Sequence, residues 1–258
     1  MLYALSFFFG AAIGSFVQLV AARYRVAPIV KSRSKCLSCG EALRALDLIP
    51  IFSYLFLKGK CRYCNSSYGF STILIELTYG IIFVLLYHFI LAGQASLLVA
   101  SLWLIYYSLL FTTMGIIAIY DNAHTYIPVP YLLFYCFLTL VVLLIRFLDD
   151  GSVLLLLAPI IVALPFLLIW VITRGRGLGF GDVMLFLGVG AFFGIEQGFA
   201  VLLLSVWIGA IVGVIIYFLR LKNANRNSVI PFVPFIVIAF IVVLFTDIDL
   251  FSIARVFA

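Results

Sequence analysis

Two isolated aspartates at the ends of apolar runs are the side chains best suited to chemistry in this sequence. Asp121 follows the apolar run 102–120, and Asp182 precedes the apolar run 183–194. Two carboxyl groups a few ångströms apart in a partly dry site cannot both ionise cheaply, so they share one proton. One can then activate water as a base while the other donates a proton, which is the chemistry of peptide hydrolysis. Asp121 and Asp182 are therefore the candidate catalytic pair.

The residues alone leave other interpretations of these aspartates open. Each could be an isolated acid at a membrane interface, or both could relay protons or bind a cation in a transporter. Many transporters contain two halves with matching interrupted segments, and this sequence shows no such correspondence. A protein that only scaffolds an assembly is a further alternative, and a cleavage assay would separate it from an enzyme.

Three alternating glycines, Gly177, Gly179 and Gly181, come directly before Asp182. Glycine permits positive φ and lets another chain approach the backbone closely. We expect these glycines to offer a backbone edge that pairs with an extended substrate segment, as in strand addition. They are the candidate substrate-binding residues next to the acid pair.

Four of the five cysteines form two CxxC pairs, Cys36 with Cys39 and Cys61 with Cys64, which are separated by 21 residues. This spacing is typical of a structural zinc site with four thiolate ligands. The segment between the helices is too short to build a large core, so a bound metal would supply much of its folding free energy. Two disulfides, or an iron–sulfur cluster, are the alternatives for the same four residues.

Glu76 is an acid inside an apolar run, about a turn from its start. Burial of a carboxylate at this depth is expensive unless the group has a partner. A structural hydrogen bond or salt bridge is one interpretation of Glu76, and a role in binding a substrate or cofactor is the other.

The composition indicates an integral membrane protein of the all-α class. The 258 residues are 66% hydrophobic and 10% charged, with a mean hydropathy of +1.30, whereas soluble domains are about 45 to 50% apolar. The apolar runs predict a bundle of about eight transmembrane helices. The predicted spans are 2–22, 71–92, 96–120, 129–147, 152–173, 183–195, 198–219 and 229–247.

The distribution of basic residues predicts the orientation of this bundle. Fourteen of the 16 Lys and Arg fall in the connections 23–70, 121–128, 174–182 and 220–228, and basic loops stay in the cytoplasm. The N-terminus would then lie outside, and both aspartates would face the cytoplasm. We divide the chain into a first helix (1–22), a cytoplasmic zinc loop domain (23–70) and a membrane core (71–258).

Several motifs together resemble those of the type IV prepilin peptidases, a family of GxGD-type membrane aspartic proteases. The matching stretches are Gly14-Ser15-Phe16, Leu46 to Pro50, Ser53 to Leu55, Lys58 to Cys64, Glu76, Asp121 with Pro128, and Gly179-x-Gly181-Asp182. GxGD alone is a weak signal, but its combination with the paired CxxC loop is highly specific. The sequence departs from the usual family pattern at Gln18, Leu37 and Val129.

The resemblance implies a function, a cofactor and a location. The protein would cleave the basic leader of type IV prepilins or pseudopilins at the cytoplasmic face of the bacterial inner membrane, with Asp121 and Asp182 as its catalytic residues. Some family members also N-methylate the new N-terminus, so S-adenosylmethionine is a candidate cofactor beside structural zinc. The expected partners are the prepilin substrate and the lipid bilayer, and no nucleic acid.

Overall fold

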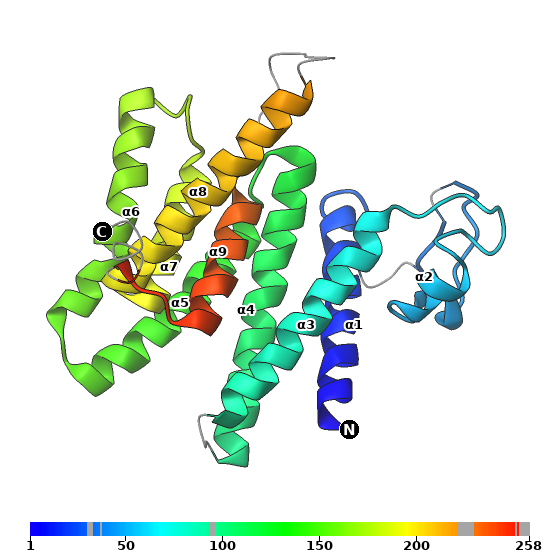
Figure 1. The fold of residues 1–258 in the computed structure, drawn as a ribbon, viewed down its shortest axis with the longest axis horizontal. Coiled ribbons are helices and arrows are strands. Elements are labelled where there is room, and N and C mark those ends of the chain that lie inside the picture. The colour runs from blue at the N-terminus through cyan, green and yellow to red at the C-terminus, as the bar shows by residue number, and fades with distance from the viewer. Residues whose placement is uncertain (30–32, 37, 93–95, 221–229, 251, 253–258) are drawn as a thin grey trace. The chain divides into compact units, whose positions relative to one another are not determined.

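The computed structural model describes residues 1–29, 33–36, 38–92, 96–220, 230–250 and 252, and these residues are mostly helical (Figure 1). Within them there is no strand, only two isolated β-bridges, Lys35 with Ala42 and Lys60 with Ser67. The predicted all-α class is therefore confirmed. The elements are α1 (Leu2–Arg23), η1 (Ala45–Leu48), α2 (Phe52–Phe56), α3 (Phe70–Ala92), α4 (Leu97–His124), α5 (Val129–Asp150), α6 (Val153–Thr173), α7 (Phe180–Phe193), α8 (Ile195–Arg220) and α9 (Val233–Thr246).

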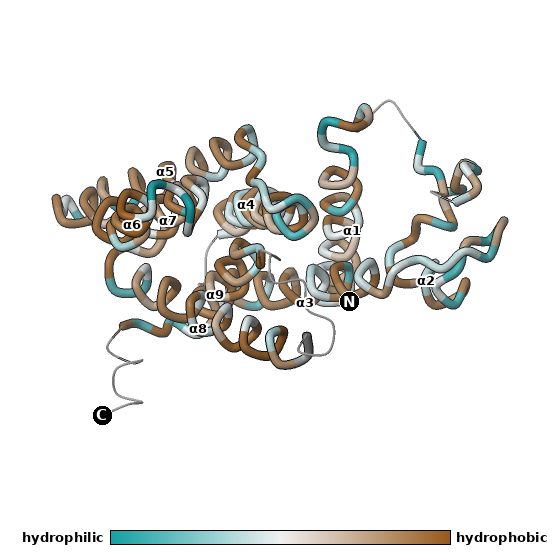
Figure 2. The backbone as a smooth tube through the Cα atoms, turned by 90° about the horizontal axis from the view of Figure 1, so that it is seen from above, coloured by the Kyte–Doolittle hydropathy of each residue, from teal (hydrophilic) through white to brown (hydrophobic). Residues whose placement is uncertain are grey.

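Most of these helices are suited to a membrane. Six of them, namely α1, α3, α4, α5, α6 and α8, are long and apolar enough to cross a bilayer by length and composition, while α7 and α9 are shorter apolar helices. Hydrophobic residues dominate along the helices, and hydrophilic residues gather at several of their ends (Figure 2). The protein is an integral membrane protein, and the number of eight crossings stays a prediction.

The helix boundaries beside the two aspartates differ from the predicted ones. α4 runs to His124 instead of residue 120, and it ends where Thr125 takes a positive φ of 52° and donates its N–H to the carbonyl of Asp121. α7 begins at Phe180 instead of residue 183, so Asp182 lies in its first turn. An acid is favoured there because the helix dipole is positive at that end. The predicted loop 121–128 is thus reduced to four residues.

The last predicted span and the connection before it also change. α9 begins at Val233 rather than at residue 229, and its first helical turn contains Pro234, which is well tolerated at a helix start. Residue 229 and nearly all of the predicted loop 220–228 lie outside the described residues.

The chain forms two units, residues 1–116 and 117–258, and α4 contributes to both. In the first unit α1 packs on α3 through two glycines. A Cβ on Gly10 would lie 2.7 Å from Cβ of Phe83, and one on Gly14 would lie 3.0 Å from Cβ of Tyr79. Close approach of two apolar helices thus depends on small residues, as expected for membrane helices. The hydroxyl of Tyr79 donates to the carbonyl of Phe111 at 2.8 Å and ties α3 to α4.

In the second unit the short helix α7 is the central element. It packs against α5, α6 and α8, and nine of its 14 residues are buried. A Cβ on Gly190 would lie 2.8 Å from Cα of Pro159, so α6 approaches α7 at backbone distance. A helix held on three sides fixes the position of its first turn, which carries Asp182. The predicted division at residues 22 and 70 stays a prediction.

Candidate active site and metal site

Both aspartates line one cavity of about 470 Å³ in the second unit. Its walls come from the end of α4, the start of α5 and the segment between these two helices, the start of α7 with the segment before it, and the segment before α9. The lining residues are Asp121, Thr125, Tyr126, Ile127, Val129, Leu132, Leu133, Gly177, Leu178, Gly179, Phe180, Gly181, Asp182, Met184, Ile230, Pro231 and Phe232. Apart from the two acids and a few hydroxyl and backbone groups, this lining is apolar.

Asp121 is almost completely buried, with 6% of its surface exposed, in the last turn of α4. Its Oδ2 accepts a hydrogen bond of 3.2 Å from the backbone N–H of Val233 at the start of α9. Neither this contact nor the contribution of the segment 230–232 to the cavity was predicted from the sequence. The only local signal was the pair Pro231 and Pro234, which brackets the start of an apolar helix.

Asp182 is half-buried in the first turn of α7. Its carboxyl group accepts a hydrogen bond from the backbone N–H of Gly179 and lies close enough to Asp121 to interact with its charge. Each of the two carboxyl groups therefore receives one backbone N–H and faces the same cavity. This arrangement suits a pair that shares one proton. The structure brings the two predicted residues together, and their catalytic role stays a prediction.

The three predicted glycines all line this cavity, but they do not use the positive φ that glycine permits. None of Gly177, Gly179 and Gly181 has a positive φ, and Gly179 has φ −74° and ψ 144°. The left-handed residues of this connection are instead Arg174 and Gly175. Because Gly181 already belongs to α7, the extended backbone edge is limited to the residues before Phe180.

Close approach is nevertheless required at Gly181. A Cβ built on it would lie 2.7 Å from Cδ1 of Ile127, in the segment between α4 and α5. The close neighbour of Gly181 is thus Ile127 of this chain, whereas the sequence predicted an extended substrate segment there.

Glu76 lies in the first unit, in the second turn of α3, with only 5% of its surface exposed. Its carboxylate accepts a hydrogen bond of 2.7 Å from the backbone N–H of Ile51 and a second one from the side chain of Ser15. Glu76 therefore makes a structural hydrogen bond, as one of the two interpretations of the sequence predicted. A role in binding substrate stays a prediction.

The four cysteines of the CxxC pairs form a cluster of potential metal ligands. The sulfur atoms of Cys36, Cys39, Cys61 and Cys64 all lie within 4.8 Å of one another. The distance between Sγ of Cys36 and Sγ of Cys64 is 3.8 Å, which is about the spacing of two thiolates on a tetrahedral zinc ion with bonds of about 2.3 Å. All five cysteines have free thiols. The cluster can bind a metal such as zinc.

The backbone around each pair has the same form. The N–H of Cys36 donates to the carbonyl of Glu41, and the N–H of Cys61 donates to the carbonyl of Ser66. The residue after each second cysteine, Gly40 or Asn65, has a positive φ. The two tight turns thus present their sulfur atoms to one point.

The four thiols lie too close together to ionise independently, and the pKa values of Cys36 and Cys39 shift in opposite directions. Backbone hydrogen bonding from Cys39, with further hydrogen bonds from Ser66 and Ser38, lowers the pKa of Cys36 to about 6. For Cys39, a backbone hydrogen bond from Glu41 acts to lower the pKa, but burial and the neighbouring sulfurs of Cys64 and Cys36 raise it to about 11. A divalent cation would relieve this repulsion and allow all four groups to ionise.

Comparison with known proteins matches both parts of the chain to one family of enzymes. Residues 8–90 match the profile described as Bacterial Peptidase A24 N-terminal domain, and residues 108–214 match the profile described as Type IV leader peptidase family. The first match contains the four clustered cysteines, and the second contains both aspartates of the cavity.

Individual relatives carry the name prepilin leader peptidase/N-methyltransferase. The one from Pseudomonas aeruginosa is 32% identical over 217 residues, which are 82% of this chain and 70% of the relative. The one from Bacillus subtilis is 32% identical over 232 residues, 88% of each chain. The one from Vibrio cholerae is 28% identical over 218 residues, 84% of this chain and 83% of the relative. No solved structure matches the chain significantly.

We expect the purified protein to contain about one zinc ion per chain, since four converging thiolates match its preferred ligand set. The double variant Cys36→Ser/Cys61→Ser should lose the metal, as measured by elemental analysis, and its 33–70 segment should become sensitive to proteases because metal binding supplies folding free energy. Cys136→Ser, which alters the fifth cysteine in α5, is the matched control and should keep the metal. A disulfide within either CxxC pair in protein handled without oxidant would contradict the zinc site.

Proposed function

Because the chain belongs to the type IV leader peptidase family, we propose that it is a membrane aspartic endopeptidase that removes the leader of prepilins or pseudopilins, with Asp121 and Asp182 as its catalytic pair. The observation that carries the assignment of these residues is their convergence on one cavity from helices far apart in the chain. The paired carboxyl groups supply the acid and the base that peptide hydrolysis needs.

The reaction follows from one proton shared between the two carboxyl groups. The ionised carboxylate removes a proton from a water molecule, whose oxygen attacks the peptide carbonyl, while the protonated partner gives its proton to the carbonyl oxygen. Collapse of the tetrahedral intermediate breaks the C–N bond. The proton taken from water passes to the departing amine, and the carboxylate that protonated the carbonyl oxygen takes that proton back, which restores the pair. The backbone N–H groups of Val233 and Gly179 hold the two carboxyl groups in place without occupying all of their oxygen lone pairs.

The cavity also suits the substrate. A prepilin carries an apolar segment after its basic leader, and the walls of the cavity include Leu132, Leu133, Met184 and Phe232. A helical substrate hides its carbonyl groups in hydrogen bonds, so the segment must be extended at the cut. The extended backbone at Gly179 gives such a segment an edge to pair with. Glu76 has no part in this proposal.

Two further parts of the proposal follow the family. The active site faces the cytoplasm of a bacterial inner membrane, as the distribution of Lys and Arg favours. The relatives' shared name includes N-methyltransferase, so methylation of the new N-terminus, with S-adenosylmethionine as donor, is a candidate second activity. The transporter alternative has no support among the relatives.

Asp121→Asn and Asp182→Asn should each lower prepilin cleavage by about 10²- to 10⁴-fold, the usual loss when a general acid or base is removed. An amide keeps the shape of the side chain but cannot hold or release the shared proton. Asp149→Asn, which changes an exposed acid at the end of α5, is the matched control and should cleave normally. Cleavage within about tenfold of the wild type in either active-site variant would exclude the pair.

Gly181→Val should reduce cleavage about tenfold or more, because overpacking costs about 1 to 3 kcal/mol and here displaces a wall of the cavity. The new side chain would collide with Ile127, so the additional change Ile127→Ala should restore part of the activity. The measurement is the cleavage rate of the two single variants and the double variant. If Ile127→Ala gave no recovery, the steric explanation would be wrong.

Cysteines introduced singly at positions 124 and 149, in a Cys136→Ser background, should report the orientation. A membrane-impermeant thiol reagent should reach position 124 only from the cytoplasmic side and position 149 only from the outer side, after subtraction of labelling in the same background. Labelling of position 124 only from outside would overturn the proposed orientation and with it cleavage at the cytoplasmic face.

A further inference from the structure

Residues 45–57, between the two CxxC pairs, form an apolar segment that contains η1 and α2. Asp47 is its only charged residue. Several of its large side chains are exposed in the structure, with Leu55 at 60% and Phe56 at 82%. The others are Leu46, Leu48, Ile49 and Phe52. Such a patch is unusual on a surface that faces water.

This apolar segment lies beside the transmembrane helices α1 and α3, against the middle of α1 and the first two turns of α3. The ring of Phe52 stacks on the ring of Phe8 in α1 with centroids 5.4 Å apart. Ile51 is buried in a cluster with Ala11 of α1 and Ile73 of α3. Figure 1 shows α2 next to the body of α1 and α3. The segment therefore does not sit beyond the bundle, as a purely soluble loop would.

The helix positions of these contacts give the depth. Ala11 precedes the end of α1 at Arg23 by 12 residues, which is about 18 Å of helix rise. On α3, Ile73 and Glu76 follow the start at Phe70 by three and six residues, about 4.5 and 9 Å. The hydrocarbon layer of a bilayer is about 30 Å thick. Contacts at these positions place the apolar segment at the depth of the lipid acyl chains.

We propose that the apolar segment 45–57 enters the bilayer beside α1 and α3 and turns back to the same side, with its exposed side chains against lipid acyl chains. Non-helical backbone at this depth must be satisfied by protein. The tightest point is Ile51, with φ 66° and ψ −52°, where the N–H of Phe52 donates to the carbonyl of Pro50 at 2.7 Å. A β-branched residue in this conformation is strained.

Glu76 satisfies the backbone at this turn. The N–H of Ile51 points at the buried carboxylate of Glu76 and donates to it at 2.7 Å. This contact gives an acid inside a transmembrane helix a structural task, which is to accept the one N–H that the strained turn directs into the bundle. The strained turn of the apolar segment thus accounts for the buried acid in α3, and this acid in turn satisfies the backbone of the turn.

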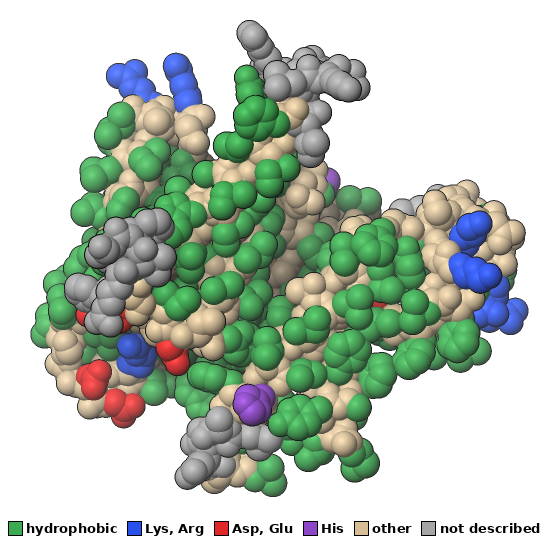
Figure 3. All heavy atoms as spheres, in the orientation of Figure 1, with side chains coloured by type: hydrophobic (Ala, Val, Ile, Leu, Met, Phe, Trp, Pro, Cys, Tyr) green, Lys and Arg blue, Asp and Glu red, His purple; other side chains and the backbone are tan. Residues whose placement is uncertain are grey.

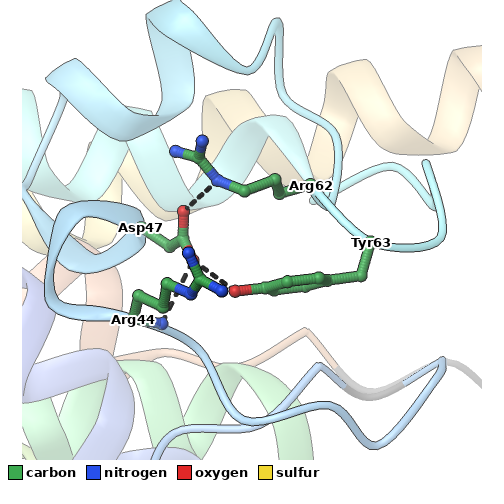
Figure 4. A network of polar contacts seen from close by, with 4 residues as sticks. All are labelled: Arg44, Asp47, Arg62 and Tyr63. Carbon is green, nitrogen blue, oxygen red and sulfur yellow. Dashed lines mark hydrogen bonds and ion pairs between the residues drawn. The ribbon is translucent and has the colours of Figure 1, made fainter.

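The charges around the segment also fit a membrane. Asp47 is neutralised by Arg62, whose Nε lies 2.7 Å from Oδ1, and it accepts further hydrogen bonds from the N–H of Arg44 and the hydroxyl of Tyr63 (Figure 4). Arg44 precedes the segment and Lys58 follows it directly. Basic side chains at both ends of an apolar segment can reach anionic headgroups while the residues between them stay in the acyl chains.

Lipid is favoured over a protein partner because the exposed side chains continue the outer surface of the same unit. Leu5, Phe8 and Phe9 of α1 are also exposed, as residues of a transmembrane helix that face lipid must be. Figure 3 shows Lys and Arg at the outer edge of the part that carries α2, with hydrophobic side chains between that edge and the helices. The inference does not rest on the proposed peptidase activity.

The test places the photoreactive amino acid p-benzoyl-phenylalanine at Leu55 or at Phe56 in the full-length protein in liposomes. Both side chains are exposed, so the replacement disturbs no packing. After irradiation, mass spectrometry should find adducts with lipid acyl chains at both positions. Phe9 in α1 is the positive control, and Glu41, an exposed residue of the first CxxC turn, is the control outside the bilayer. The lipid adduct at positions 55 and 56 should exceed that at position 41 about tenfold, as expected for side chains in acyl chains rather than water.

Three results would overturn the proposal. Lipid adducts at 55 and 56 no more abundant than at 41 would show that the segment lies in water. Cross-links from these positions to another part of the chain would show that protein covers the face. In a repeat of the experiment with prepilin added, cross-links to prepilin in place of lipid adducts would make the face a substrate site. Because no result depends on cleavage, loss of the proposed function would not affect the outcome.

Discussion

The cost of an ionised carboxyl group near hydrocarbon is the constraint on which the second unit depends. A single ionised acid at the end of an apolar helix would cost free energy. Two neighbouring carboxyl groups can instead share one proton and carry one charge between them. The fold meets this condition by fixing α7, which is surrounded by α5, α6 and α8, so that Asp182 is presented to the cavity that Asp121 also lines. The close contacts of Gly181 and Gly190 are what this placement requires of the sequence.

The first unit solves a similar problem with a different acid. Glu76 is buried, and its charge is met by a backbone N–H and a hydroxyl instead of by a second carboxyl group. Because Ile51 lies between the two CxxC pairs, the same hydrogen bond joins the cluster of potential metal ligands to α3. In both units a buried acid therefore accepts a hydrogen bond from a backbone N–H of another segment and holds that segment in place.

The parts of this protein that could be predicted from sequence carry local signals. The CxxC spacing indicates a metal site, and the lone aspartates beside apolar runs indicate a catalytic pair. Both patterns can be recognised within a few residues of sequence. The partner of Asp121 could not be found in this way, because Val233 is an ordinary apolar residue 112 positions away. The start of α7 was predicted three residues too late, so the sequence did not show that Gly181 lies within the helix and packs on Ile127. The apolar segment 45–57 was hidden by the nine Lys and Arg of residues 23–70, which led us to treat that whole stretch as a cytoplasmic loop.

The central claim, that Asp121 and Asp182 act as one unit through a shared proton, is tested most directly by comparing cleavage rates of both single Asn variants with that of the double variant. Residues that work as a unit show strongly non-additive losses, because removal of either one already ends their joint action. The account predicts that Asp121→Asn/Asp182→Asn cleaves prepilin about as slowly as the slower single variant. Losses that multiply in the double variant would mean that the two carboxyl groups act independently, and would contradict the account.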